Sequence, residues 1–305
     1  MRIAFLFAGQ GAQYTGMGRE LSEVSPAARA VFAMADALRP GTGEQCFSAS
    51  KQELSITRNT QPCVFAADLA AARALAENGV TPEFAAGFSL GELAALTFAG
   101  AFEDEDGFWL VMKRAELMQA QAERFPSGMA AALGLAAERV EALCRECGVY
   151  PANYNCPGQV VVSGEREALG AFCSKASEAG ARALPLAVNG GFHSPLMAGA
   201  AADFETELSY CSFHTPKYPV YANLTGTPYR PPFAPTLARQ IDSPVLWEKT
   251  IRELVAQGAD AFVELGPGRT LCGFMKKIAP DARAVYHVQD RASLNETLAA
   301  LKTGG

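Results

Sequence analysis

The hydrophobic positions in the first part of the chain fall into short apolar runs and longer segments with helical spacing. Apolar runs at Ile3–Phe7 and Phe84–Ala86 predict buried strands, because each is only a few residues long and carries no polar position. Helical spacing or high alanine content predicts helices at Arg19–Leu38 with a break near Pro26, Pro62–Asn78, Leu90–Ala99, and Asp104 to about Glu123. Strands that alternate with helices in this way are typical of an α/β domain with a parallel sheet.

The pattern changes after Pro126-Ser127-Gly128, where strands become more closely spaced. The predicted elements are a strand at Met129–Leu135, a helix at Ala137–Cys147, strands at Tyr150–Asn155 and Gln159–Ser163, a helix at Arg166–Ala179 and a strand at Ala181–Ala187. The order β-α-β-β-α-β is that of a ferredoxin-like unit. The sequence therefore predicts a small subdomain at residues 127–192, inserted into a large domain made of residues 1–126 and 193–305.

The remaining segments return to the pattern of the large domain. A helix is expected after Val245-Leu246-Trp247, a strand at Ala261–Leu265, a helix from Thr270 and a last strand near Ala284–Val288. These elements extend the predicted parallel sheet, so both ends of the chain contribute to one domain.

Composition limits the classes of function. The 305 residues are 49% hydrophobic and 19% charged, with a formal net charge of −6, which argues against a general nucleic-acid binder. No segment is long and apolar enough for a membrane span or a signal peptide, so we expect a cytoplasmic protein. The eight cysteines are scattered singly and are expected to be reduced. Cys144 and Cys147 form a lone C-x-x-C pair, so neither a metal nor a bound cofactor is expected.

The pentapeptide Gly87-Phe88-Ser89-Leu90-Gly91 follows the second predicted strand and opens a helix. This strand–turn–helix context is what a nucleophile elbow requires, because it raises the serine hydroxyl above the carboxyl end of a parallel strand. An ordinary βα turn in an Ala/Gly-rich chain is the alternative. The nucleophile reading makes Ser89 the reactive residue.

A serine nucleophile needs a base, and the chain has only three histidines. His287 lies on the predicted last strand, and His214 lies in a proline-flanked loop. His193 lies between Gly190-Gly191 and Ser194-Pro195, where the chain re-enters the large domain. We therefore favour His193 as the base of Ser89, with the other two left open.

An acyl-transfer site also needs donors for an oxyanion. In elbow sites one donor is the backbone N–H after the serine, here that of Leu90. The loop Gly9-Gln10-Gly11 follows the first strand and could supply the second; a phosphate cradle is the alternative, but the glycine spacing does not fit one. Arg114 lies among apolar residues of a helix and is either a surface residue or a buried anion clamp.

These motifs belong to a longer series that resembles the malonyl-CoA:acyl carrier protein transacylases and the acyltransferase domains of polyketide synthases. The series runs through nearly the whole chain: Phe7–Gln13, Thr60-Gln61-Pro62, Gly87–Glu92, Lys113-Arg114, Asn153–Val160, Phe192–Met197, Ser243–Trp247 and Glu264–Gly268. The resemblance implies an α/β-hydrolase-like large domain with an inserted ferredoxin-like subdomain. It also implies transfer of a malonyl group through an ester on Ser89, with malonyl-CoA and acyl carrier protein as partners.

Roles then follow from the resemblance for residues that match its motifs. Ser89 would be the nucleophile and His193 its base, while the backbone N–H groups of Gln10 and Leu90 would bind the oxyanion. Arg114 would hold the malonyl carboxylate. Supporting roles are implied for Gln61 and Asn155 near the pocket, for Phe192, whose bulk would exclude an α-methyl branch, and for the carbonyl of Leu246, which would orient the histidine.

Two positions depart from the resemblance. Phe88 stands where the family usually has histidine, and Ala8 replaces a common proline. Phe88 leaves the extender selectivity and the hydrolysis of the acyl-enzyme open, so a polyketide-type acyltransferase or an acyl hydrolase of the same fold remains the alternative. A non-catalytic scaffold that binds a carrier is disfavoured because both Ser89 and His193 are present. Candidate contacts for an acidic carrier are Arg269, Lys276 and Lys277, with solvated helix charges as the alternative.

Overall fold

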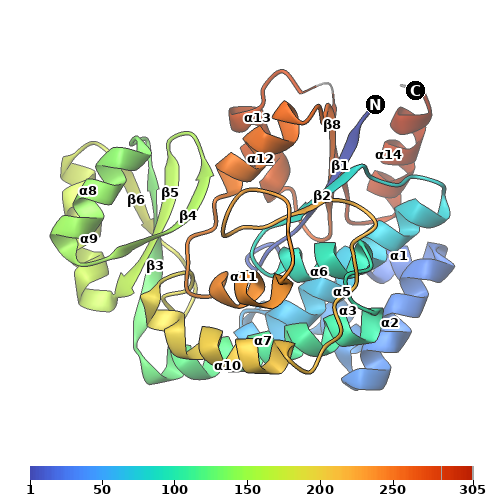
Figure 1. The fold of residues 1–305 in the computed structure, drawn as a ribbon, viewed down its shortest axis with the longest axis horizontal. Coiled ribbons are helices and arrows are strands. Elements are labelled where there is room, and N and C mark those ends of the chain that lie inside the picture. Colours follow the sequence, from blue (N-terminus) through green and yellow to red (C-terminus); the bar gives the residue numbers. More distant parts are fainter. Residues whose placement is uncertain (283, 304–305) are drawn as a thin grey trace.

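The computed structural model describes residues 1–282 and 284–303, which form two separate sheets (Figure 1). The larger sheet is parallel, with its strands in the order β7–β2–β1–β8–β9. Its strands are β1 (Ile3–Phe7), β2 (Phe84–Gly87), β7 (Val220–Tyr221), β8 (Ala261–Leu265) and β9 (Ala284–Val288). The predicted α/β class is confirmed, because the chain forms this parallel sheet and, separately, the antiparallel sheet described below.

Helices surround the parallel sheet. They are α1 (Arg19–Val24), α2 (Pro26–Leu38), α3 (Thr42–Ser48), α4 (Lys51–Leu54), α5 (Thr57–Glu77), α6 (Gly91–Phe98), α7 (Asp104–Arg124), α10 (Ala198–Leu208), α11 (Phe233–Arg239), α12 (Trp247–Ala256), α13 (Thr270–Ile278) and α14 (Arg291–Thr303), with the 3₁₀ turn η1 at Pro195–Met197. Helix α5 starts at Thr57 and not at the predicted Pro62, because the N–H of Thr60 donates to the carbonyl of Ile56 (2.9 Å) and closes an earlier turn. None of the described helices has the length and apolar composition of a membrane span.

The second sheet is antiparallel and has the strand order β4–β5–β3–β6. Its elements are β3 (Ser127–Leu133), α8 (Ala137–Cys147), β4 (Tyr150–Cys156), β5 (Gln159–Glu165), α9 (Arg166–Glu178) and β6 (Arg182–Pro185). This is the predicted β-α-β-β-α-β order, and it lies to one side of the parallel sheet in Figure 1. The division of the chain at residues 127 and 192 stays a prediction.

Main-chain hydrogen bonds join the two parts. The N–H of Tyr154 on β4 donates to the carbonyl of Val245 (2.9 Å), and the N–H of Val245 donates to the carbonyl of Ala152 (2.9 Å). Strand β4 is thereby fixed against the segment that leads into α12. This contact holds the antiparallel sheet over the carboxyl ends of β1 and β2, where the predicted catalytic loops begin.

The glycines of the elbow allow three backbones to meet. A Cβ atom on Gly91, the first residue of α6, would overlap the carbonyl oxygens of Phe7 and Ala8 at the end of β1. A Cβ atom on Gly87 would overlap the backbone of Gly91. Small residues at both positions therefore let α6 pack directly on β1, which brings the loop after β1 beside the turn after β2.

We predict that Gly91→Ala lowers the free energy of unfolding by about 1–3 kcal/mol, since the added methyl group would push α6 away from β1. Gly170→Ala is the matched control, because Gly170 lies in helix α9 with open space at its Cβ position. That variant is expected to be stabilised by about 0.5–1 kcal/mol. Chemical denaturation measures both, and an unchanged midpoint for Gly91→Ala would contradict this account of the elbow.

Candidate active site

Ser89 lies on a strained turn directly after β2. Its φ angle is 54°, and the only other non-glycine residue with positive φ among those described is His193, at 57°. Such backbone angles cost energy and persist only where surrounding contacts enforce them. For Ser89 the contacts come from the Asn223 side chain, which accepts from the Ser89 N–H (2.7 Å) and donates to the Gly87 carbonyl (2.7 Å).

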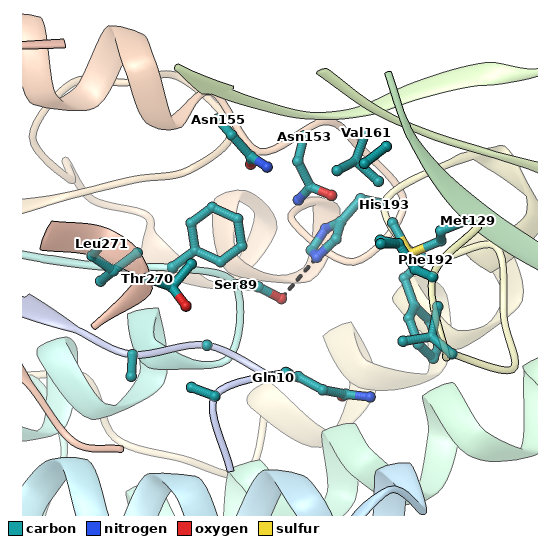
Figure 2. Close-up of a pocket in the computed structure, with 18 of the residues that line it drawn as sticks. Gln10, Ser89, Met129, Asn153, Asn155, Val161, Phe192, His193, Thr270 and Leu271 are labelled. Carbon is teal, nitrogen blue, oxygen red and sulfur yellow. Dashed lines mark hydrogen bonds between the residues drawn. The ribbon is translucent and has the colours of Figure 1, made fainter. Parts of the chain in front are cut away.

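The two strained residues meet through their side chains. The Ser89 Oγ lies 2.7 Å from Nε2 of His193 (Figure 2). The Nδ1 atom of His193 lies 2.8 Å from the carbonyl oxygen of Gln240. A carbonyl only accepts, so Nδ1 carries the proton and Nε2 is left free to accept from the serine hydroxyl. The predicted pairing of these two residues, 104 positions apart in the chain, is thus present in the geometry.

The prediction that Leu246 orients the histidine is wrong. The Leu246 carbonyl accepts from the N–H of Thr250 (2.9 Å) in the first turn of α12, so it is already used there. Its N–H donates to the Asn223 carbonyl (2.9 Å), and Leu246 therefore fixes Asn223 and not His193. Gln240 takes the orienting role. It precedes the Ser243–Trp247 motif by a few residues, and nothing in its own sequence context marks it.

Arg114 of α7 is buried, with 1% of its surface exposed, so the surface reading of this residue is wrong and the anion-clamp reading stays a prediction. Its Nη1 donates to Gln61 Oε1 (2.7 Å). Its Nη2 donates to Gln240 Oε1 (2.8 Å) and to Ser89 Oγ (3.2 Å). Its Nε has no acceptor among the described residues, and no described carboxylate lies within salt-bridge distance of it.

Burial dominates the electrostatics of this group. Desolvation lowers the pKa of Arg114 to about 10, with the charge of Glu92 acting in the opposite direction. Desolvation, followed by the charge of Arg114, lowers the pKa of His193 to about 4. The imidazole is therefore neutral over the ordinary pH range and can accept a proton, while the guanidinium stays charged beside the serine.

The two predicted oxyanion donors are free. Neither the N–H of Gln10 nor that of Leu90 donates to another described residue. Their segments are adjacent because β1 pairs with β2 in parallel register and the Phe88 N–H donates to the Phe7 carbonyl (3.0 Å). Two unpaired N–H groups beside a serine are what an oxyanion requires.

A cavity of about 250 Å³ opens in front of Ser89 and His193 (Figure 2). The loop after β1 and Phe88 form one wall, α13 forms another, and the antiparallel sheet faces them. Wall residues include Gln10, Met118, Met129, Asn153, Asn155, Val161, Phe192, Thr270, Leu271 and Phe274. Asn155 is buried, and its Oδ1 has no partner among the described residues. Arg114 and Gln61 lie outside this wall, although Gln61 donates to Gln10 Oε1 (3.5 Å).

Phe88 takes part in the aromatic packing beside the cavity. Its ring lies edge-on to Trp247, with centroids 5.4 Å apart, and tilted against Phe274 at 6.1 Å. The neighbours are thus arranged around phenylalanine, and the backbone at Ser89 keeps the elbow angle. The substitution relative to the family pattern is accommodated by packing.

Known proteins support the motif series. Residues 4–286 match the family model described as "Acyl transferase domain". The malonyl CoA-acyl carrier protein transacylase of Bacillus subtilis (strain 168) is 37% identical over 310 residues, which cover 99% of this chain and 98% of that protein. That of Staphylococcus aureus (strain MRSA252) is 35% identical over 309 residues, covering 97% and 99%.

Solved structures agree over the same length. The malonyl CoA-acyl carrier protein transacylase from Clostridium perfringens superposes with a TM-score of 0.95 at 36% identity, covering 99% of this chain and 98% of that one. A malonyl-transacylase in complex with a type II PKS acyl-carrier protein (PlMCAT:AntF, holo) gives a TM-score of 0.95 at 34% identity, covering 98% and 100%. The chain therefore belongs to the acyl transferase domain family, and it is an enzyme of the same kind as these transacylases.

Proposed function

We propose that this acyltransferase moves the malonyl group of malonyl-CoA to the phosphopantetheine thiol of acyl carrier protein, in two steps through an ester on Ser89. The observation that carries the proposal is the position of the serine hydroxyl, which lies 2.7 Å from a neutral imidazole and 3.2 Å from a buried guanidinium. A nucleophile, its base and a binding group for a carboxylate therefore converge on one oxygen.

In the first step Ser89 Oγ attacks the thioester carbon, and its proton passes to Nε2 of His193. The carbonyl oxygen becomes an oxyanion that accepts from the N–H groups of Gln10 and Leu90. The C–S bond then breaks, and the proton on His193 goes to the departing CoA thiolate. In the second step the carrier thiol gives its proton to His193 and attacks the ester, and Ser89 Oγ takes that proton as it leaves.

Arg114 explains why a malonyl group would be preferred. Its Nη groups are held by the side-chain oxygens of Gln61 and Gln240, while its Nε–H is unpaired. A carboxylate attached to the Ser89 ester lies within reach of this guanidinium and would pair with it. Because Gln10 contacts Gln61 and lines the cavity, a shift of these two amides would open the guanidinium to the acyl chain.

The cavity walls suit the rest of the substrate. Asn155 offers an unpaired oxygen to an amide N–H of the pantetheine arm, which both malonyl-CoA and the holo carrier contain. Phe192 is buried beside His193, and its ring would crowd a methyl branch next to the thioester. We therefore assign malonyl in preference to methylmalonyl.

The first test is acylation of the protein by malonyl-, methylmalonyl- and acetyl-CoA, followed by mass spectrometry. We expect a malonyl ester on Ser89, weaker labelling by the other two, and no label in Ser89→Ala. In Arg114→Ala the preference for malonyl over acetyl should fall by at least about tenfold, since a charged hydrogen bond of this kind is worth about 1.5–3 kcal/mol. An unchanged ratio would contradict the clamp, and release of free malonate faster than transfer to holo carrier would favour the acyl hydrolase.

The base assignment has its own test. Since burial holds the pKa of His193 near 4, its ring resonances should stay at their neutral positions as the pH falls from 8 to 5. NMR of the histidine side chains measures this, with His193→Ala used to assign the signal. A titration midpoint near the ordinary histidine value of about 6.5 would show that the imidazole is solvated and not buried as described.

A further inference from the structure

Glu92 is a buried carboxylate that the proposed reaction does not use. It is in the first turn of α6, three residues after the nucleophile, and is fully buried. Its Oε2 accepts from the Asn223 N–H (3.1 Å) and from Gln240 Nε2 (2.9 Å), and its Oε1 accepts from the Tyr229 hydroxyl. Burying a charged carboxylate costs free energy, and these three hydrogen bonds offset part of that cost.

Two of these donors also hold the catalytic groups. The Asn223 side chain fixes the turn at Ser89. Gln240 Nε2 donates to the Ser89 carbonyl (2.7 Å) as well as to Glu92, and the Gln240 main-chain carbonyl orients His193. Glu92 is therefore hydrogen-bonded directly to two of the residues that position the serine and the histidine.

The amide of Gln240 carries the connection to Arg114. Its NH₂ group faces two acceptors, Glu92 and the Ser89 carbonyl, so its oxygen must face the other way. That oxygen accepts from Arg114 Nη2 (2.8 Å). An ionised Glu92, together with the Ser89 carbonyl, therefore fixes the direction of the amide, and the amide in turn holds the guanidinium beside Ser89.

Glu92 is also a counter-charge that acts on Arg114, and the amide of Gln240 is hydrogen-bonded to both groups. The charged and titratable groups that act on Glu92 are Arg114 from α7 and Tyr229 from the segment before α11. While Ser89 reacts, a positive charge forms on His193, and the positive charge of Arg114 opposes it. A buried anion on the far side of Gln240 would offset that opposition.

We propose that Glu92 is a positioning residue that acts through Gln240: as a buried anion it fixes the amide of Gln240 and offsets the charge of Arg114 while Ser89 is acylated. The inference rests on the proposed function, because it concerns the same nucleophile. It assigns to this carboxylate a role in the rate of acylation in addition to its contacts in the fold.

The ionisation of Glu92 gives the test its readout. Burial raises its pKa to about 7, against the hydrogen bonds from Tyr229, Gln240 and Asn223 and the charge of Arg114. The anion is therefore lost as the pH falls through 7, where His193 is still neutral. Between pH 8 and pH 6 the ionised fraction falls from about 0.9 to about 0.1, so the acylation rate of the wild type should fall up to about tenfold.

The experiment measures single-turnover acylation of Ser89 by malonyl-CoA from pH 5.5 to 9, in the wild type and in Glu92→Gln. Glutamine has the same shape: its oxygen can accept from Asn223 and Gln240 while its NH₂ donates to the Tyr229 oxygen. We expect the variant to be at least about tenfold slower at pH 8. Its rate should also not fall as the pH drops through 7, whereas that of the wild type should; this fall is called the limb of the pH profile. Glu167→Gln, in the exposed first turn of α9, is the matched control and should keep the limb.

A second variant keeps the proposal falsifiable if Glu92→Gln does not fold. Tyr229→Phe removes one donor to the carboxylate, so the limb should move to higher pH. A limb near pH 7 that persists in Glu92→Gln, a wild-type rate that is flat across this range, or an unshifted limb in Tyr229→Phe would each overturn the proposal. Equal slowing of Glu92→Gln at every pH would also overturn it, since a merely structural role predicts that result.

The same pH series with p-nitrophenyl acetate separates this inference from the proposed function. That ester tests the reactivity of Ser89 without a substrate carboxylate. If the wild type reacts with it but never with malonyl-CoA, the proposed function fails while the limb can still be measured. If malonyl loading proceeds and the fall of the rate near pH 7 is the same in Glu92→Gln as in the wild type, only the inference fails.

Discussion

A positive charge buried beside a serine is the constraint on which the rest of this site depends. Arg114 has no carboxylate partner within reach among the described residues, and it is held by the neutral side chains of Gln61 and Gln240. Burial, and after it the same charge, lowers the pKa of His193 and keeps its imidazole neutral. A substrate that brings its own carboxylate would complete the pairing that the protein leaves open, which links selectivity and reactivity to one group.

The fold supplies this arrangement by bringing distant segments to one edge of a parallel sheet. Ser89 follows β2, the Gln10 loop follows the neighbouring strand β1, and the antiparallel sheet is hydrogen-bonded to the segment before α12. Two strained backbones, at Ser89 and His193, remain in place because buried hydrogen bonds surround them. The strain is concentrated where the chemistry is expected, as in other functional sites.

The fold and the pair Ser89–His193 could be predicted from the sequence because they leave local signals. Strand-length apolar runs and a Gly-x-Ser-x-Gly turn indicated the fold and the nucleophile, and the scarcity of histidine favoured His193. The series of motifs along the whole chain then decided between these readings and their alternatives. Gln240 and Asn223 could not be found in this way, since a glutamine or asparagine in a loop looks the same whether it faces solvent or four buried partners. The error at Leu246 has the same origin: which carbonyl meets an imidazole depends on tertiary packing and not on the motif that contains it.

The central claim is that Arg114 binds the free carboxylate of an acyl group carried by Ser89. A crystal structure of the malonyl-enzyme, trapped after brief exposure to malonyl-CoA, tests it most directly. The account predicts an ester on Ser89 Oγ, its carbonyl oxygen at the N–H groups of Gln10 and Leu90, and the carboxylate paired with the guanidinium of Arg114. A carboxylate that points into the open cavity, with Arg114 still bonded only to Gln61 and Gln240, would contradict it.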